Sequence, residues 1–310
     1  MYSIVIPCYN SGETIKKVIN LTKIELEKIK IQNYEFILVN DCSPDNGKTI
    51  SILKELANKN DNITVIDLAK NSGQHNATMC GLHYAKGDFI ISMDDDLQTH
   101  PSQLEKLISA LDENTDIVYG FYPHKKHSFL RNVFSKINHL TVRILIGKPK
   151  NLKTSSFWII RRFVKDYIIK FESKDCYLQG LFLRTTKNIK SIPLKHFKRE
   201  TGSSNYTLKK LFNLYIKMLC YSIVPIRISS FLGVLFSMVG FILSIIVFFI
   251  KLFNPNVVSG YTSLMFAISF FSGLILLFIG IIGEYVARIF SSQSADPQYV
   301  IRNIYRQENQ

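Results

Sequence analysis

The first 120 residues alternate between short apolar runs and longer segments with helical spacing. Runs rich in β-branched residues, each ending in a polar cluster, predict strands at Ser3–Pro7, Glu35–Asn40, Ile63–Leu68 and Asp88–Met93. Between them, apolar positions at helical spacing predict helices at Thr14–Lys30, Gly47–Asn58 and Gln74–Lys86. This alternation indicates an α/β fold with a mostly parallel sheet covered by helices.

Two long apolar stretches follow near the C-terminus. No charged residue occurs from Ile228 to Ile250 or from Leu252 to Gly283. A membrane-spanning helix needs about 20 mostly apolar residues, so each stretch suffices for one span. We therefore expect a C-terminal two-helix transmembrane hairpin. A buried helical pair in a soluble core is the alternative, but such helices seldom lack polar residues on every face.

The charges beside these stretches predict a topology. Arg227 precedes the first stretch and Arg288 follows the second, while the connecting loop carries only Lys251 at its edge. Basic residues favour the cytoplasmic side, and the N-terminus does not resemble a signal peptide. We expect a multi-pass protein of the cell inner (plasma) membrane, with the N-terminal α/β domain and both termini cytoplasmic.

Four regions are expected along the chain. The α/β domain occupies residues 1–206, and an amphipathic interfacial helix occupies 207–226. The transmembrane hairpin covers 227–290, with a short loop near 253–261, and 291–310 form a cytoplasmic tail.

Positive charge is concentrated ahead of the first apolar stretch. Residues 121–220 hold 22 Lys and Arg against 4 Asp and Glu, an excess of 18, whereas the whole chain carries +14. A basic segment beside membrane spans is suited to anionic headgroups. Nucleic acid is the weaker explanation of this charge, so we expect a membrane partner and no nucleic acid.

An acidic triplet is the strongest candidate for chemistry. Asp94, Asp95 and Asp96 follow an apolar strand, and alternation along it would turn Asp94 and Asp96 to one side and Asp95 to the other. With the side-chain oxygen of Gln98, this is a hard oxygen site suited to Mg²⁺ or Mn²⁺. The metal would be shared with a substrate diphosphate. A solvated acidic turn that caps the helix after Pro101 is the alternative.

Polar residues also follow the first two predicted strands, at Pro7–Asn10 and Asn40–Ser43. Because ligands bind beyond the carboxyl ends of parallel strands, these residues and the acidic triplet should meet at one rim. Asp41 could accept hydrogen bonds from a base or ribose, or could form an Asx-turn. Glu13 could be a first-turn acid favoured by the helix dipole.

The order of these motifs resembles the GT-A fold of family 2 glycosyltransferases. The matching segments are Val5–Asn10, Val39–Asp45, Asn71–Gln74 and Met93–Gln98. More narrowly, the chain resembles polyisoprenyl-phosphate glycosyltransferases, including dolichol-phosphate mannose synthases and bacterial undecaprenyl-phosphate sugar transferases. That resemblance depends on Arg131–Ser135, Thr154–Phe157 and Lys198–Ser204.

The resemblance implies a role for each candidate residue. Nucleotide-binding residues would be Pro7, Tyr9, Asn10, Glu13, Asp41, Gly73, Gln74 and Asp94. Metal ligands would be Asp94, Asp96 and Gln98. Acceptor or phosphate contacts would come from Arg131, Ser135, Arg199 and Ser204, where the planar arginine fork suits phosphate oxygens. The catalytic set would be Asp94, Asp96, Arg131 and Arg199, with Asp95 a low-ranked base.

The chain departs from its relatives beside Phe157. Some relatives have Asp before this Phe and many have Arg after it, whereas this chain has Ser156 and Trp158. A base role for that Asp therefore cannot be transferred to this chain. A phosphate acceptor needs no base, because its second pKa lies near 6 and it is already anionic at neutral pH.

The expected activity is the inverting, metal-dependent transfer of a sugar from a nucleotide diphosphate sugar, with UDP-sugar favoured. The acceptor would be a polyprenyl phosphate such as undecaprenyl phosphate, used in cell-envelope polysaccharide assembly. Transfer to a hydroxyl of a lipid-linked saccharide and a non-enzymatic membrane adaptor are the alternatives. A processive polysaccharide synthase is disfavoured, because synthases of that class carry a Gln-x-x-Arg-Trp segment and this chain has none. A homo-oligomer is possible.

Overall fold

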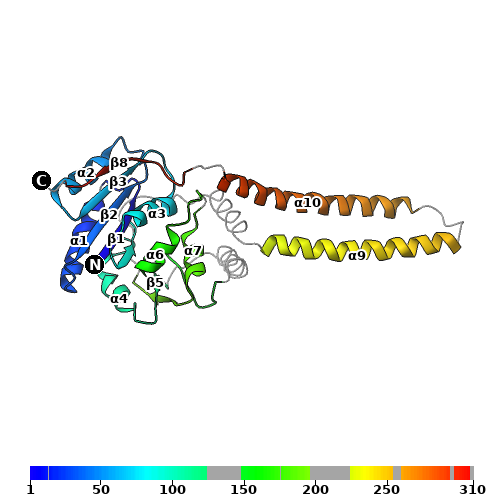
Figure 1. Cartoon of the computed structure of the whole chain (residues 1–310), viewed down its shortest axis with the longest axis horizontal. Helices are drawn as coiled ribbons and strands as arrows, with labels where there is room; N and C mark the ends of the chain where they lie inside the picture. The colour runs from blue at the N-terminus through cyan, green and yellow to red at the C-terminus, as the bar shows by residue number, and fades with distance from the viewer. Residues whose placement is uncertain are drawn as a thin grey trace. The chain divides into compact units, whose positions relative to one another are not determined.

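The computed structural model describes residues 1–12, 14–123, 148–174, 176–195, 224–253, 260–293 and 297–307 (Figure 1). The chain divides into two compact units. The sheet unit comprises Met1–Thr207 and Ala295–Gln310, and the helix-pair unit comprises Leu208–Ser294.

The sheet unit is built on a mixed sheet. In the described residues it has eight strands in the order β7-β5-β6-β4-β1-β2-β3-β8. The strands are β1 (Tyr2–Cys8), β2 (Tyr34–Asn40), β3 (Ile63–Leu68), β4 (Phe89–Ser92), β5 (Ile117–Phe121), β6 (Trp158–Arg161), β7 (Ile189–Pro193) and β8 (Ile301–Tyr305). The central strands β4, β1, β2 and β3 are parallel, while β6 and β8 pair antiparallel to β4 and β3. The α/β fold with a mostly parallel sheet is therefore confirmed.

Helices pack on both faces of this sheet. They are α1 (Ile15–Lys28), α2 (Lys48–Lys59), α3 (Gln74–Tyr84), the 3-10 turn η1 (Pro101–Gln103), α4 (Leu104–Ser109), α6 (Arg162–Ile168) and α7 (Leu178–Thr185). Each of the four strands and three helices that the sequence predicts before residue 94 is present, with shifts of a few residues at the ends. Local patterning therefore determined this half of the sheet.

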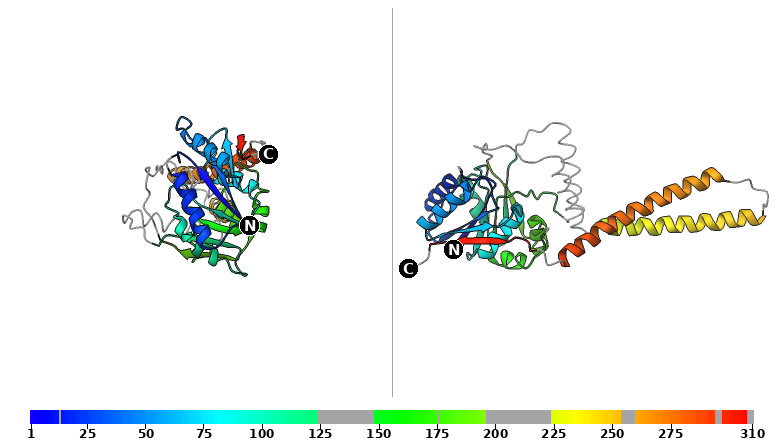
Figure 2. Two further views of the ribbon diagram at one scale, coloured as in Figure 1. Left: turned by 90° about the vertical axis from the view of Figure 1, so that its left-hand side faces the viewer. Right: turned by 90° about the horizontal axis from the view of Figure 1, so that it is seen from above.

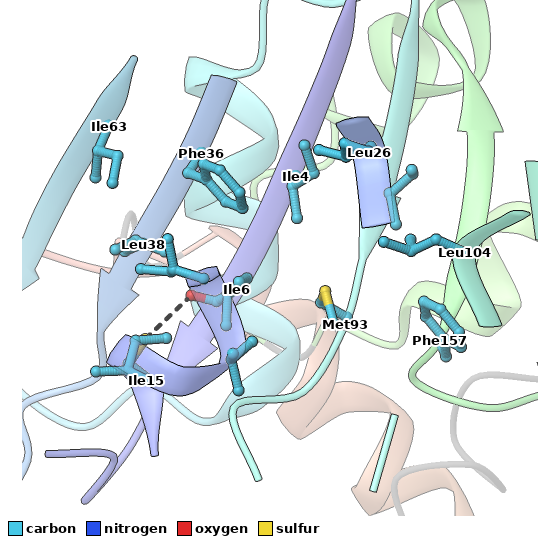
Figure 3. Close-up of a cluster of buried hydrophobic side chains, with 14 of the residues drawn as sticks. Ile4, Ile6, Ile15, Leu26, Phe36, Leu38, Ile63, Met93, Leu104 and Phe157 are labelled. Carbon is cyan, nitrogen blue, oxygen red and sulfur yellow. Dashed lines mark hydrogen bonds between the residues drawn. The ribbon is translucent and has the colours of Figure 1, made fainter. Parts of the chain in front are cut away.

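The hydrophobic core lies between one face of the sheet and helices α1, α2 and α4. Figure 3 shows Ile4 and Ile6 of β1 close to Phe36 and Leu38 of β2, with Ile15 on the helix side. All of these side chains are fully buried. Residues of opposite parity in β1 and β2 are buried too, on the face that contacts α3. Strands that are apolar on both faces are typical of a parallel sheet between helix layers.

Gly81 sets the distance between α3 and the sheet. A Cβ built on Gly81 would lie 2.4 Å from Val5 Cγ1 and 3.3 Å from Val39 Cγ2. Any side chain at this position would force the helix away from β1 and β2. Because α3 begins at Gln74, this close packing also positions the residues at its N-terminus.

The C-terminal residues differ from the sequence-based expectation. The segment 291–310 was expected to be a separate tail, but β8 pairs antiparallel with β3 and closes that edge of the sheet. In Figure 2 this strand is red and lies against the blue strands of the sheet. No local pattern predicts this strand, because Ile301–Tyr305 is a short mixed run of apolar and polar residues inside a mostly polar segment.

The helix-pair unit contains α9 (Val224–Phe253) and α10 (Tyr261–Gln293). The Phe236 ring of α9 meets the rings of Phe270 and Phe271 of α10 edge to face, at centroid distances of 6.4 and 6.3 Å. Among the described residues, no helix has the combined length and hydropathy that crossing a membrane requires. The predicted transmembrane hairpin is not confirmed, and residues 207–223 of the predicted interfacial helix lie outside the described residues.

We expect Gly81→Ala to lower the free energy of unfolding by about 1–3 kcal/mol, the usual cost of overpacking a tight interior. The added methyl group would collide with Val5 Cγ1. Chemical unfolding followed by the fluorescence of Trp158, the only tryptophan and a buried one, measures the change. Ser51→Ala, on an exposed position of α2, is the control. Equal stability of the two variants would contradict this account of α3 packing.

Candidate functional site

The three carboxylates lie in a closed turn just beyond β4, which we call the acidic turn (Asp94–Thr99). The backbone N–H of Asp94 donates to Thr99 Oγ1 at 2.9 Å. Leu97 has a φ of 60°, in the left-handed region that non-glycine residues seldom adopt. Such strain persists only where the surroundings hold it, and it clusters at functional sites. The turn therefore presents its carboxylates in a fixed arrangement.

Asp94 joins three parts of the sheet unit. Its Oδ1 accepts a hydrogen bond from Gln74 Nε2 at the start of α3, at 2.7 Å. Its Oδ2 accepts from Ser156 Oγ, in the segment before β6, at 2.5 Å. The structure thus brings Gln74, predicted from the sequence, onto Asp94. It also adds Ser156, which the sequence showed only as a departure from its relatives.

Asp95 has a different set of partners. Its Oδ2 accepts a hydrogen bond from the backbone N–H of Tyr9 at 3.1 Å, and another from the hydroxyl of Ser11. This carboxylate therefore anchors the segment after β1 to the segment after β4. Ser11 has no motif around it that would have revealed this contact in the sequence.

Burial and mutual repulsion disfavour the charged forms of these carboxylates. Burial raises the pKa of Asp94 to about 7, and the neighbouring Asp96 and Asp95 act in the same direction. Hydrogen bonds from Ser156 and Gln74 oppose this rise in pKa only in part. Burial likewise raises the pKa of Asp95, with a further contribution from Asp96. Negative charge is thus crowded together here, and the hydrogen bonds to Asp94 and Asp95 come from neutral donors.

A divalent cation fits this turn chemically. Mg²⁺ and Mn²⁺ prefer carboxylate oxygens, and Mg²⁺ is commonly held by one or two carboxylates together with substrate phosphates rather than by a full protein cage. Among the described residues, no group of three or more His, Cys, Asp or Glu side chains has the geometry to hold a metal. The roles of Asp94 and Asp96 as metal ligands stay predictions. The predicted third ligand, Gln98, donates its backbone N–H to Asp96 Oδ1 at 3.0 Å, and its role as a ligand stays a prediction.

Tyr122, just after β5, also borders the acidic turn. Burial raises the pKa of its hydroxyl, and Asp94 and Asp96 raise it further, which places the phenol near both carboxylates. The sequence did not single out Tyr122. It lies some 25 residues beyond the acidic motif and has no distinctive pattern around it, so only the fold brings it to the site.

Asp41 follows β2 and holds the loop that leads into α3. Its Oδ1 accepts from the Ser72 N–H at 2.7 Å, and its Oδ2 accepts from the Gly73 N–H at 2.9 Å. Gly73 has a φ of 85°, a conformation that favours glycine. Asp41 is only 4% exposed, and burial raises its pKa against the effect of the two N–H donors. Through these contacts Asp41 stabilises the loop that precedes α3. Its contact with a nucleoside stays a prediction.

The end of β1 and the segment after it carry three of the predicted nucleotide-binding residues. Pro7 lies inside β1, opposite Val39. Tyr9 is 42% exposed, and Asn10 has a φ of 59° and donates its N–H to Ser43 Oγ at 3.0 Å. The structure thus joins the segments after β1 and β2 at one edge of the sheet.

Five predicted site residues lie outside the described part of the chain: Glu13, Arg131, Ser135, Arg199 and Ser204. Their assigned contacts with nucleotide, phosphate and acceptor stay predictions.

Comparison with known proteins gives three findings. The family model described as Glycosyl transferase family 2 matches residues 3–169. The undecaprenyl-phosphate 4-deoxy-4-formamido-L-arabinose transferase of Yersinia enterocolitica serotype O:8 / biotype 1B is 31% identical over 306 residues, covering 97% of this chain and 93% of that protein. The crystal structure of glucosyl-3-phosphoglycerate synthase from Mycobacterium tuberculosis, in complex with Mn²⁺, UDP and phosphoglyceric acid, is 16% identical with a TM-score of 0.52. That match covers 71% of this chain and 76% of that one, and indicates a shared fold.

The raised pKa of Asp94 predicts a pH-dependent stability. In the folded chain this pKa is about 7, whereas in an unfolded chain it is about 3.9. The folded chain binds this proton more tightly, so the carboxyl lowers stability progressively as the pH rises from about 4 to about 7. Asp94→Asn removes this titration. In EDTA we expect the variant to exceed the parent in free energy of unfolding at pH 8 by on the order of 2 kcal/mol, and to match it near pH 4.

Chemical unfolding at both pH values, again followed by Trp158 fluorescence, measures this difference. Asp61→Asn is the matched control, because Asp61 is exposed and lies far along the chain from the acidic turn. A variant of Asp94 that is less stable than the parent at pH 8 would refute the assigned electrostatics.

Proposed function

The chain belongs to glycosyl transferase family 2, and we propose that it transfers a sugar from a nucleoside diphosphate sugar to a polyprenyl phosphate. The observation that carries the proposal is the acidic turn. Carboxylates that are crowded together in a half-buried turn and hydrogen-bonded by neutral donors are poorly stabilised by the protein alone. A divalent cation that bridges them to a diphosphate would offset this charge.

The donor is proposed to be a UDP-sugar, with Mg²⁺ or Mn²⁺ as the cofactor. Support comes from the fold-level neighbour, which was crystallised with Mn²⁺ and UDP. The segments after β1 and β2, with Tyr9, Asn10 and Asp41, lie at the same edge of the sheet as the acidic turn and would receive the nucleoside. When bound, the metal supplies charge neutralisation for the departing diphosphate.

The acceptor is proposed to be a polyprenyl phosphate, with undecaprenyl phosphate the first choice. Support comes from the Yersinia relative, an undecaprenyl-phosphate sugar transferase whose sequence matches 97% of this chain. Ser156 adds chemical support, because it occupies the place where some relatives have an Asp, and its hydroxyl is committed to Asp94. A phosphate acceptor is anionic without a base, whereas a sugar hydroxyl would need one.

The lipid acceptor would bring the enzyme to the cytoplasmic face of the membrane. In the helix pair, large apolar side chains are widely exposed, including Phe231 at 70%, Phe253 at 75% and Leu276 at 69%. Exposed apolar surface of this extent calls for lipid or another protein to cover it. The uncharged runs 228–250 and 252–283 and the basic stretch 121–220 agree with an anionic membrane surface. We propose membrane association on these grounds.

The test is a transfer assay with the full chain in detergent. Sugar nucleotides of UDP and GDP are presented with undecaprenyl phosphate and Mn²⁺, and radiolabel in the lipid fraction is counted. One UDP-sugar is expected to be used, and EDTA is expected to abolish turnover. Label transferred to a lipid-linked saccharide, and not to the lipid phosphate, would replace the acceptor assignment.

We expect Asp96→Ala to lower kcat by about 10²–10³-fold, the usual loss when one charge-stabilising group is removed from an active site. Asp96 would hold the metal against the diphosphate. Asp61→Ala, which removes an exposed carboxylate, should retain the parent rate. Unchanged turnover by Asp96→Ala would exclude it as a metal ligand.

A further inference from the structure

The last strand of the sheet unit carries an irregularity beside the candidate donor site. Asp67 of β3 pairs with Asn303 of β8, but the next residue, Leu68, pairs with Ile301. Arg302 is therefore the extra residue of a β-bulge, with no counterpart on β3 in the backbone register. Bulges are over-represented next to active sites, where they redirect a side chain.

The bulge turns Arg302 toward buried polar groups at the end of β3. Its Nη1 lies 3.7 Å from Asp67 Oδ2, and its Nη2 donates to the carbonyl oxygen of Ala69 at 3.1 Å. The Asp67 side chain is only 5% exposed, whereas that of Arg302 is 54% exposed. A carboxylate this deeply buried is costly to charge without a partner, so Arg302 gives Asp67 a compensating charge from the edge of the sheet.

From Asp67 a chain of hydrogen bonds runs across the strand ends. Asn40 Nδ2 donates to Asp67 Oδ1 at 2.7 Å. Ser43 Oγ then donates to Asn40 Oδ1 at 2.7 Å, and accepts the N–H of Asn10 at 3.0 Å. Three links join different segments, from β8 to β3, from β3 to β2, and from the loop after β2 to the loop after β1, while the Ser43–Asn40 bond lies between β2 and its own loop. Asn10 and Asp41, the next residue after Asn40, are the candidate contacts of the nucleoside.

We propose that Arg302 is a positioning residue for the donor: through Asp67 and Asn40 it fixes the two loops that receive the nucleoside. This inference rests on the proposed function, because it assumes that a nucleoside binds between those loops. Both loops contain non-glycine residues with positive φ, Asn10 at 59° and Cys42 at 51°. Backbone in this state relaxes unless its surroundings hold it, and the hydrogen-bond chain from Arg302 provides that restraint.

The C-terminal segment is also held by contacts that do not involve Arg302. Tyr299 Oη lies 3.0 Å from His83 Nδ1 of α3, and Gln298 Nε2 donates to the Ser173 carbonyl oxygen at 3.1 Å. The backbone ladder with β3 and the bond from the Ala69 N–H to the Val300 carbonyl oxygen, at 2.8 Å, remain as well. Replacement of the Arg302 side chain should therefore leave β8 in place.

The test measures binding of UDP with Mn²⁺ to the full chain in detergent by titration calorimetry. Arg302→Met is expected to weaken UDP binding about fivefold, the scale of coupling within one hydrogen-bonded network. Arg302→Lys, which keeps the charge beside Asp67, should recover most of the loss. Arg306→Met is the matched control, because it removes an exposed arginine just past the same strand.

Two further readouts separate positioning from simple destabilisation. Arg302→Met should lower the thermal midpoint without nucleotide, because Asp67 loses its compensating charge, but at the temperature of the titration the variant should be as fully folded as the Arg306→Met control. In a double-mutant cycle, Arg302→Met and Ser43→Ala should be non-additive in UDP affinity although the two side chains are not in direct contact. UDP affinity of Arg302→Met within about twofold of the control, or strict additivity with Ser43→Ala, would overturn the inference.

The unaltered chain provides the remaining check. If it binds no UDP in the presence of Mn²⁺, the donor assignment under the proposed function fails, and the inference about Arg302 fails with it. If it binds UDP and Arg302→Met binds equally well, only the inference about Arg302 fails.

Discussion

The arrangement of the site depends on one electrostatic constraint, the crowding of carboxylates in a partly buried turn. Asp94 receives hydrogen bonds from an amide and a hydroxyl, and its pKa rises to about 7 because burial and the neighbouring aspartates disfavour its charge. Such a cluster reduces the stability of the folded chain. It is tolerated where a cation or ligand later provides the missing positive charge, so the cost in stability and the capacity for function have one physical origin.

The surrounding fold keeps this unfavourable cluster in place. The acidic turn is closed by Thr99, Asp95 is bound to the segment after β1, and Asp94 is bound to α3 and to the segment before β6. Gly81 allows α3 to approach the sheet closely enough for Gln74 to reach Asp94. These hydrogen bonds and the packing of α3 keep the like-charged side chains close together, where repulsion alone would move them apart.

The C-terminal strand β8 pairs with β3, so residues near the C-terminus pack against the N-terminal half of the sheet. The chain leaves the sheet unit for α9 and α10 and then returns to add β8 beside β3. As a result, a residue near position 300 lies at the end of a hydrogen-bond chain that reaches Asn10. The loops after β1 and β2 are thus linked by hydrogen bonds to an edge strand that carries no recognisable motif.

The sequence by itself determined the α/β alternation up to residue 94, the two long apolar helices and the acidic motif, because local periodicity and strand-end residues encode these features directly. It also carried the family resemblance, since the motifs fall in order along the chain. Only the tertiary structure revealed the bond from Ser156 to Asp94, the approach of Tyr122 and the return of β8. These depend on contacts between segments that are distant in sequence, and no local pattern of polar and apolar residues specifies which strand another will pair with. The residues that meet beyond the strands could therefore be predicted from the strand ends, whereas the contacts that hold them in place were decided by packing.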